Sequence, residues 1–247
     1  MSKTNNEVIM ERHNILICDD EKDIVSSLKI YLSGENVRVF EAGNGQEALD
    51  IVAKEEIHLI LMDIMMPQMD GVTACAKLRE TSNVPVIMLT AKGESSDKIL
   101  GLNVGADDYI TKPFEPAEVV ARVKSQLRRY TQLGSMPASD KANVWRLGPI
   151  ELEEETKRVT VDGEDVTLTP IEYQILLLLI RHPGRVFSSS QIYEQVWNEE
   201  AIGSEGAVSV HIRHLRKKIE IDPSEPRYLK VVWGQGYKLE DRKERRS

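Results

Sequence analysis

The stretch LILMDIMMPQMD, from Leu59 to Asp70, decides the fold of the N-terminal half of this chain. Four apolar residues lead into Asp63, and Pro67, Asp70 and Gly71 then turn the chain away. A short apolar run bounded by turn residues is typical of a buried strand in a parallel sheet. A carboxylate at the carboxyl end of such a strand opens into the crevice where α/β sheets hold ligands. Alone, Asp63 would more often be a turn or helix-capping residue than a site residue.

Three further strand-like runs also end in polar side chains. The runs NILIC, VPVIML and DDYIT are followed by Asp19, Asp20 and Glu21, by Thr90, and by Lys112. In a parallel sheet these ends lie along one edge, so we expect the acids, the hydroxyl and the ammonium group to converge. Such a layout suits an acidic Mg²⁺ site with a carboxylate nucleophile beside it.

Strand and helix patterns alternate through the first half of the chain. The expected strands are 14–18, 37–42, 59–63, 84–89 and 107–111, and the expected helices are 24–32, 46–53, 72–79, 97–103 and 116–129. Five strand–helix units indicate an α/β fold with a doubly wound, five-stranded parallel sheet.

The pattern changes in the second half. Short alternating runs in 144–169 flank Asp162-Gly163, which is a hairpin turn signal. Thr169, Pro170 and Glu172 provide an N-cap, a first helical residue and a capping box. A second helix is expected from Ser189 or Ser190, a third over about 207–220, and two strands around 234–236. The small sheet, three helices and terminal hairpin predict a winged helix-turn-helix α+β domain.

Composition narrows the class of protein. At 247 residues the chain is long enough for two domains, and no apolar run approaches the ~20 residues that span a bilayer. The polar N-terminus lacks the apolar core of a signal peptide. Cys18 and Cys75 are too few for a disulfide framework, and we expect both to be buried thiols in a reducing cytoplasm.

Charge is unevenly distributed along the chain. Residues 1–127 carry a net charge of −8, whereas residues 206–247 carry +5. The overall pI near 5.3 argues against indiscriminate binding to nucleic acid. The basic C-terminal segment is compatible with a local DNA contact, and the last residues, KERRS, are expected to be a solvated tail.

The pattern Asp19-Asp20, Asp63, Thr90 and Lys112-Pro113 resembles the receiver domain of two-component response regulators. The C-terminal half resembles the winged-helix domain of the OmpR/PhoB subfamily, and the likeness covers about Asn14 to Glu240. It implies the flavodoxin-like strand order 2-1-3-4-5 for the receiver. The expected divisions are a disordered leader (1–13), a receiver (14–130), a flexible linker (131–143), a winged-helix DNA-binding domain (144–241) and a basic tail (242–247).

The resemblance implies roles for the residues at the sheet edge. Asp63 would accept a phosphoryl group from a sensor histidine kinase in a Mg²⁺-dependent reaction. Asp20 and Asp63 are the expected direct Mg²⁺ ligands, Asp19 binds directly or through water, and the family adds the backbone carbonyl of Met65. Lys112 and Thr90 would bind phosphoryl oxygens, and Tyr109 would swing inward as the switch. Simple charge neutralisation by Lys112 and ordinary strand packing by Tyr109 are the alternatives.

The family also implies a receiver homodimer after phosphorylation. The candidate symmetric ion pairs are Lys98–Glu118, Asp108–Arg122 and Asp107–Arg129, with Val119 as an apolar contact. Exposed pairs contribute only ~0.2–1 kcal/mol each, so they would set the register more than the affinity.

The helix over 207–220 is the candidate recognition helix. Val208, Ile212, Leu215 and Ile219 are spaced to face the core. The candidate DNA-binding residues are His211, Arg213, His214, Arg216 and Lys217 on the helix and Trp233 in the wing, where the family commonly has arginine. With VHIRHLRK, this Trp233 is similar to vancomycin-resistance-type regulators of Gram-positive bacteria. Double-stranded DNA with direct-repeat half-sites and RNA polymerase are the further implied partners, and no membrane is expected.

Two other functions fit part of this pattern. A phosphorylation-independent DNA-binding regulator would have a vestigial receiver, against which the complete Asp, Thr and Lys set argues. Haloacid-dehalogenase-type phosphatases use an Asp nucleophile and Mg²⁺ but need an acid two residues later, where this chain has Met65. We therefore expect a transcription regulator and not an enzyme. The chemistry expected of this regulator is the gain and loss of a phosphoryl group on its own Asp63.

Overall fold

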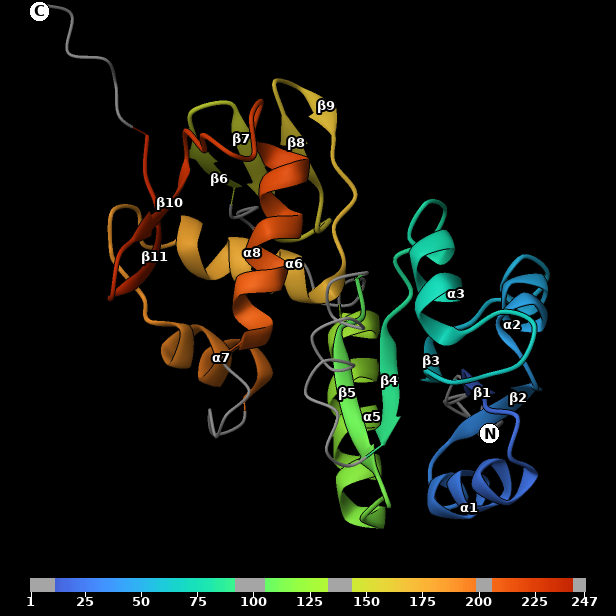
Figure 1. Cartoon of the computed structure of the whole chain (residues 1–247). Coiled ribbons are helices and arrows are strands. Elements are labelled where there is room, and N and C mark those ends of the chain that lie inside the picture. The colour runs from blue at the N-terminus through green and yellow to red at the C-terminus, as the bar shows by residue number, and fades with distance from the viewer. Residues whose placement is uncertain (1–11, 92–104, 133–143, 199–205, 242–247) are drawn as a thin grey trace, which may run out of the picture.

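Five parallel strands form the sheet of the N-terminal domain, in the order β2-β1-β3-β4-β5 (Figure 1). The computed structural model describes residues 12–91, 105–132, 144–198 and 206–241. The strands are β1 His13–Cys18, β2 Val37–Ala42, β3 Leu59–Asp63, β4 Val86–Ala91 and β5 Asp108–Lys112. The predicted doubly wound sheet and its strand order are confirmed.

Two pairs of helices cover the two faces of this sheet. Helices α1 (Lys22–Leu32) and α5 (Pro116–Gln132) pack on one face, and α2 (Gly45–Val52) and α3 (Gly71–Leu78) pack on the other. Alternate residues of β3 enter the two cores, which explains why the whole strand is apolar. The helix expected over 97–103, most of the leader and most of the linker lie outside the described residues.

The turn after β3 fixes the position of Asp63. A Cβ atom on Gly71 would lie 2.0 Å from the carbonyl oxygen of Asp63, so only glycine permits this approach. Asp70 caps α3, because its side chain accepts a hydrogen bond from the Thr73 N–H at 2.7 Å. The strand end and the following helix are therefore held in one compact unit.

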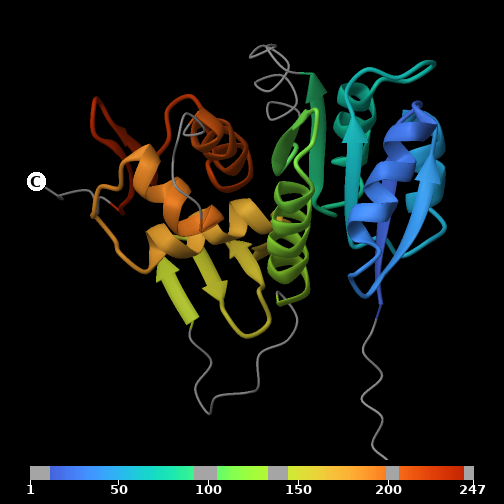
Figure 2. The same cartoon turned by 90° about the horizontal axis from the view of Figure 1, so that it is seen from below.

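The C-terminal domain has the expected winged-helix architecture. Its strands and helices are β6 Val144–Leu147, β7 Ile150–Glu153, β8 Val159–Val161, β9 Glu164–Asp165, α6 Pro170–Ile180, α7 Ser189–Trp197, α8 Gly206–Ile219, β10 Leu229–Val232 and β11 Gly236–Leu239. Figure 2 shows the four-stranded antiparallel sheet on one side of α6 and α8 on the other. One apolar core unites the sheet, the three helices and the terminal hairpin.

The predicted start of α6 is confirmed. The Thr169 side chain accepts from the Glu172 N–H, and the Glu172 carboxylate accepts from the Thr169 N–H at 2.8 Å, which completes the capping box. Glu172 also pairs with Lys218 of α8 at 2.7 Å, so the cap ties α6 to α8.

The winged-helix domain lies against the β5–α5 edge of the first domain in both views (Figures 1 and 2). Arg129 of α5 donates a hydrogen bond to the Val196 carbonyl of α7 at 3.1 Å. Tyr109 of β5 packs against the cores of both domains. In the part of the chain that the structure describes, no helix combines the length and hydrophobicity needed to cross a bilayer.

Candidate functional site

Three carboxylates gather at the carboxyl edge of the parallel sheet. Asp19 and Asp20 follow β1 and Asp63 ends β3, and one oxygen from each lies within 4.8 Å of the others. Asp19 is buried, Asp63 is 6% exposed, and Asp20 is exposed. The expected convergence of the acids is confirmed, and Asp20 opens the cluster to solvent.

Lys112 reaches this cluster from the end of β5. Its Nζ lies 2.8 Å from Asp19 Oδ2 and 2.9 Å from Asp63 Oδ1, with the exposed Glu21 at 3.5 Å. Apart from the exposed Glu21, the three clustered aspartates and one ammonium group leave two negative charges when all are ionised. A divalent cation would balance that remainder.

Burial acts on the pKa values of both Asp63 and Lys112. Desolvation raises the pKa of Asp63, although the hydrogen bond and the charge of Lys112 act to lower it. Burial is the largest single influence on the pKa of Lys112 and lowers it, but the hydrogen bonds and the negative charges of Asp19 and Asp63 together outweigh burial and raise that pKa. The charged forms of Asp63 and Lys112 are therefore stabilised by the hydrogen bonds and opposite charges around them.

The donor set fits Mg²⁺, which prefers oxygen ligands and usually takes one or two carboxylates. Asp20 and Asp63 offer those carboxylates beside Asp19. Met65 is held next to them, because its N–H donates to Asp63 Oδ2 at 3.1 Å. The Met65 side chain points to solvent, so only its backbone is suited to the site.

The two candidate switch residues lie on neighbouring strands. Thr90, at the end of β4, is 1% exposed, and its Oγ1 has no hydrogen-bond partner among the described residues. Tyr109 pairs with Met88 in the sheet register, and its side chain contacts both domain cores. Binding of phosphate by Thr90 and the inward swing of Tyr109 stay predictions.

Helix α8 presents the expected apolar face. Val208, Ile212, Leu215 and Ile219 are all buried in the winged-helix core, which confirms the helical spacing. Arg213 and Lys217 are exposed, and His214 is partly exposed. This polar side is the surface that a DNA groove could contact.

His211 departs from the expectation that it lies on the polar surface. It is 1% exposed, and its ring lies 5.5 Å from that of Trp197. Burial lowers its pKa to about 3. Its place three residues after Val208 and four before Leu215 puts it on the buried side, a signal that the sequence contained.

Two other DNA-binding candidates have different surroundings. Arg216 is half-buried and donates from Nε to the Leu229 carbonyl at 3.0 Å, so part of its role is structural. Trp233 is 88% exposed in the turn between β10 and β11, as expected for a wing residue. Contact of either residue with DNA stays a prediction.

The candidate dimer residues meet partners within the same chain. Arg122 binds Asp108 at 3.0 Å and Glu118 at 3.0 Å. Lys98 lies outside the described residues, and pairing across a dimer stays a prediction.

Val119 was expected to be a surface contact, which is wrong. It is fully buried in the receiver core, because its spacing with Val123 and Leu127 places it on the sheet-facing side of α5. Sequence reasoning also missed Arg79, which binds the buried Asp107 at 2.8 Å.

Comparison with known proteins covers nearly the whole chain. Residues 15–124 match the family profile described as "Response regulator receiver domain", and residues 163–239 match "Transcriptional regulatory protein, C terminal". Regulatory protein VanR of Enterococcus faecium is 42% identical over 92% of this chain and 98% of its own length. Transcriptional regulatory protein SrrA of Staphylococcus aureus is also 42% identical, over 92% of this chain and 95% of its own.

A solved structure agrees with this match. A mutant of RitR superposes with a TM-score of 0.71 at 25% identity, covering 93% of this chain and 99% of the other. VanR and SrrA are equally identical to this chain, and both matches cover nearly its whole length.

Proposed function

Because the chain belongs to the two-component response regulators with an OmpR/PhoB-type DNA-binding domain, we propose that Asp63 is its phosphorylation site. The observation that carries the proposal is the position of Asp63 at the end of β3, 2.9 Å from Lys112 and inside the three-carboxylate cluster. Asp19 shares the contact with Lys112 and the place in the cluster, but among the described carboxylates Asp63 alone combines them with the end of the central strand β3.

The chemistry at this site is transfer of a phosphoryl group to a carboxylate. An oxygen of Asp63 forms the bond to phosphorus as the bond to the donor, a phosphorylated sensor histidine kinase, breaks. Asp19, Asp20, Asp63 and the Met65 carbonyl would hold Mg²⁺, which would supply positive charge to the phosphoryl oxygens. Lys112 exchanges its contact with Asp63 for one with a phosphoryl oxygen, and the Thr90 hydroxyl donates to another.

The output is regulated transcription. Phosphorylation promotes pairing of two receivers, and the winged-helix domains bind direct-repeat half-sites in double-stranded DNA through α8 in the cytoplasm. Exposed Arg213 and Lys217 support such a contact, because positively charged side chains bind phosphates and arginine can read guanine in the major groove. RNA polymerase is the expected partner at the promoter.

The test is incubation with acetyl phosphate and Mg²⁺ followed by intact-mass measurement. The wild type should gain one phosphoryl group, and chelation of Mg²⁺ should prevent the gain. Asp63→Asn should not react. Asp70→Asn is the matched control, because it changes a nearby carboxylate yet keeps a residue that can cap α3.

Equal incorporation into wild type and Asp63→Asn would contradict the assignment of the acceptor. Incorporation that is unaffected by chelation would contradict the role of the carboxylate cluster.

A further inference from the structure

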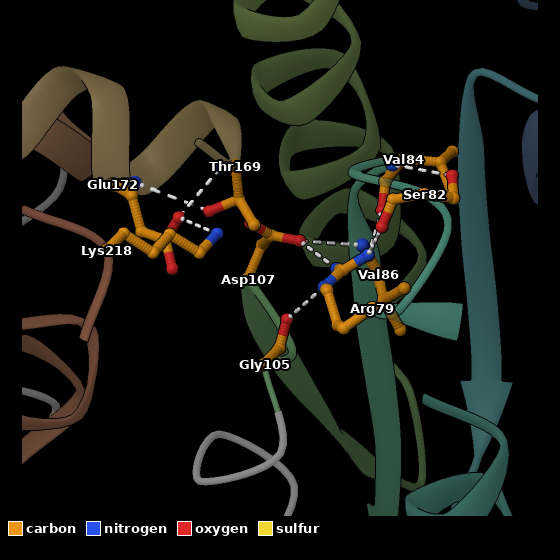
Figure 3. Close-up of polar contacts among 9 residues, drawn as sticks. All are labelled: Arg79, Ser82, Val84, Val86, Gly105, Asp107, Thr169, Glu172 and Lys218. Atoms are coloured by element: carbon orange, nitrogen blue, oxygen red, sulfur yellow. Dashed lines mark hydrogen bonds and ion pairs between the residues drawn. The ribbon is translucent and has the colours of Figure 1, made fainter. Parts of the chain in front are cut away.

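A small pocket of about 140 Å³ lies at the boundary between the two domains, among the residues drawn in Figure 3. Arg79 lines it from the receiver, Thr169 and Glu172 line it from the start of α6, and His214, Lys217 and Lys218 line it from α8. Four of these six side chains carry a positive charge or can gain one. The pocket is therefore a candidate site for a negatively charged ligand.

Arg79 is fixed in place and still keeps one N–H group (Figure 3). Its guanidinium donates to the carbonyls of Gly105, Ser82 and Val84 at 2.7, 3.3 and 2.8 Å. It also donates from Nη2 to Asp107 Oδ2 at 2.8 Å. These bonds use four of the five N–H groups of an arginine. The fifth, on Nη2, can donate to a ligand, and the bound guanidinium loses little further freedom when it does so.

Helix α8 supplies further donors. Lys218 Nζ pairs with the buried Glu172 at 2.7 Å, and this contact leaves two of the three N–H groups of the lysine. Lys217 is exposed and forms no ion pair within the part of the chain that the structure describes. His214 lies one helical turn before Lys218, so both side chains face the same side of the helix.

The charges around the pocket do not cancel. The arginine and the two lysines bring three positive charges. Glu172 and Asp107, which pair with two of these cations, bring two negative charges. One positive charge remains when His214 is neutral, and two remain when it is protonated. Such an excess attracts an anion.

A neighbouring imidazole is exposed to the same positive potential. His211 is buried, and its Nε2 has no hydrogen-bond partner among the described residues. Burial is the main reason why the pKa of His211 is low, and the positive charges of His214, Arg79 and Lys218 lower it further. Three of the four pocket cations therefore act together on one point inside the boundary.

The volume of the pocket limits the size of the ligand. One molecule of liquid water occupies about 30 Å³, so the pocket has room for a group as large as about four waters. Sites for drug-sized ligands are larger, about 300–1,000 Å³. A tetrahedral oxyanion such as phosphate is of the right size. A phosphate ester would have to place its phosphoryl group in the pocket and the rest of the molecule outside.

We propose that this pocket, which we call the anion pocket, binds a small oxyanion of the phosphate class. Arg79 donates to the anion from the receiver, and His214 and Lys217 donate from α8. Hydrogen bonds of this kind, between a cationic donor and an anionic oxygen, are about twice as strong as neutral ones.

The anion pocket is separate from the phosphorylation site. The groups that hold Arg79 come just before β4 and β5, so the pocket lies at the amino edge of the parallel sheet. Asp63 lies at the carboxyl edge, where β3 ends. The inference therefore goes beyond the proposed function, because it needs neither Asp63 nor a phosphoryl donor.

A titration of the ¹⁵N-labelled, unphosphorylated full chain with sodium phosphate tests the anion pocket. Heteronuclear NMR spectra are recorded at constant ionic strength, with a chelator present so that no metal ion binds phosphate at the carboxyl edge. The wild type should show shifts that saturate as one site fills. Glycerol phosphate is titrated in parallel, and the tighter of the two ligands shows whether the pocket favours the free or the esterified anion.

Two pairs of variants locate the binding. Lys217→Glu should lower the phosphate affinity by about tenfold or more, because it removes a charged donor and adds a repelling carboxylate. Its control is Arg213→Glu, which makes the same charge change at an exposed position of α8 that does not line the pocket. Asp107→Asn should raise the affinity by about threefold or more, because it removes a negative charge from the partner of Arg79. Asp108→Asn is its control, since Asp108 pairs with Arg122 instead.

Shifts of the wild type that rise linearly without saturating would overturn the proposal. Equal losses of affinity in Lys217→Glu and Arg213→Glu would also overturn it, because they would mark a general effect of charge. Circular dichroism checks the fold of each variant, and the Lys217→Glu pair decides the question if Asp107→Asn unfolds. Either outcome leaves the assignment of Asp63 as it stands.

Discussion

His211 should make the winged-helix domain sensitive to acid, and His211→Gln should remove that sensitivity. Burial lowers the pKa of this imidazole from 6.5 to about 3, and the positive charges of His214, Arg79 and Lys218 act in the same direction. The folded state therefore binds fewer protons than the unfolded state between these values. Stability from this group is complete above pH 6.5 and is lost as the pH falls toward 3.

The magnitude follows from the size of the shift. Each pH unit below 6.5 lowers the free energy of unfolding by about 1.4 kcal/mol for one such group. Between pH 7 and pH 5 the wild type should lose about 2 kcal/mol that His211→Gln retains. Asp107 acts in the opposite sense, because its pKa is raised to about 6, so the difference between variant and wild type is the informative quantity.

Urea denaturation followed by tryptophan fluorescence measures this difference. The three tryptophans, Trp145, Trp197 and Trp233, all lie in the winged-helix domain, so the signal reports that domain. His182→Gln is the control, because His182 is exposed at the end of α6. If the stability gap between His211→Gln and wild type were the same at pH 7 and pH 5, the burial argument would be refuted.

Three other perturbations test separate parts of the account. Glu220→Ala should destabilise the winged-helix domain by about 4 kcal/mol in urea, because the buried carboxylate accepts three backbone N–H groups, and Glu220→Gln should cost less. Mg²⁺ at about ten times its Kd should stabilise the receiver by about 1.4 kcal/mol in a thermal melt, and Asp20→Asn should abolish most of that gain. Arg213→Ala and Lys217→Ala should together weaken DNA binding and make its salt dependence shallower, as measured by fluorescence anisotropy across a salt series.

The sequence predicts the convergence of polar side chains at the carboxyl edge of the parallel sheet because its signals are local. Asp19, Asp63, Thr90 and Lys112 each follow a recognisable strand, and the parallel topology alone brings those strand ends together. The cap at Thr169 is equally local, since it depends on residues three positions apart.

The contacts of Arg79 and Asp107 at the boundary between the two domains could not be predicted in this way. Arg79 and Asp107 are 28 residues apart, and neither belongs to a strand-end pattern or a capping motif. Thr169 enters the same boundary from the other domain, so their proximity depends on tertiary packing alone. His211 is an intermediate case: helical spacing indicated its burial, but its polar ring suggested the surface.

The most direct test of the central claim is the affinity of the full chain for DNA before and after phosphorylation. A duplex selected from a random library by the phosphorylated wild type serves as the probe, at one fixed salt concentration. The account predicts that acetyl phosphate and Mg²⁺ raise the affinity of the wild type and leave that of Asp63→Asn unchanged. An equal rise in both proteins, or no rise in a wild type shown by mass to be phosphorylated, would contradict it.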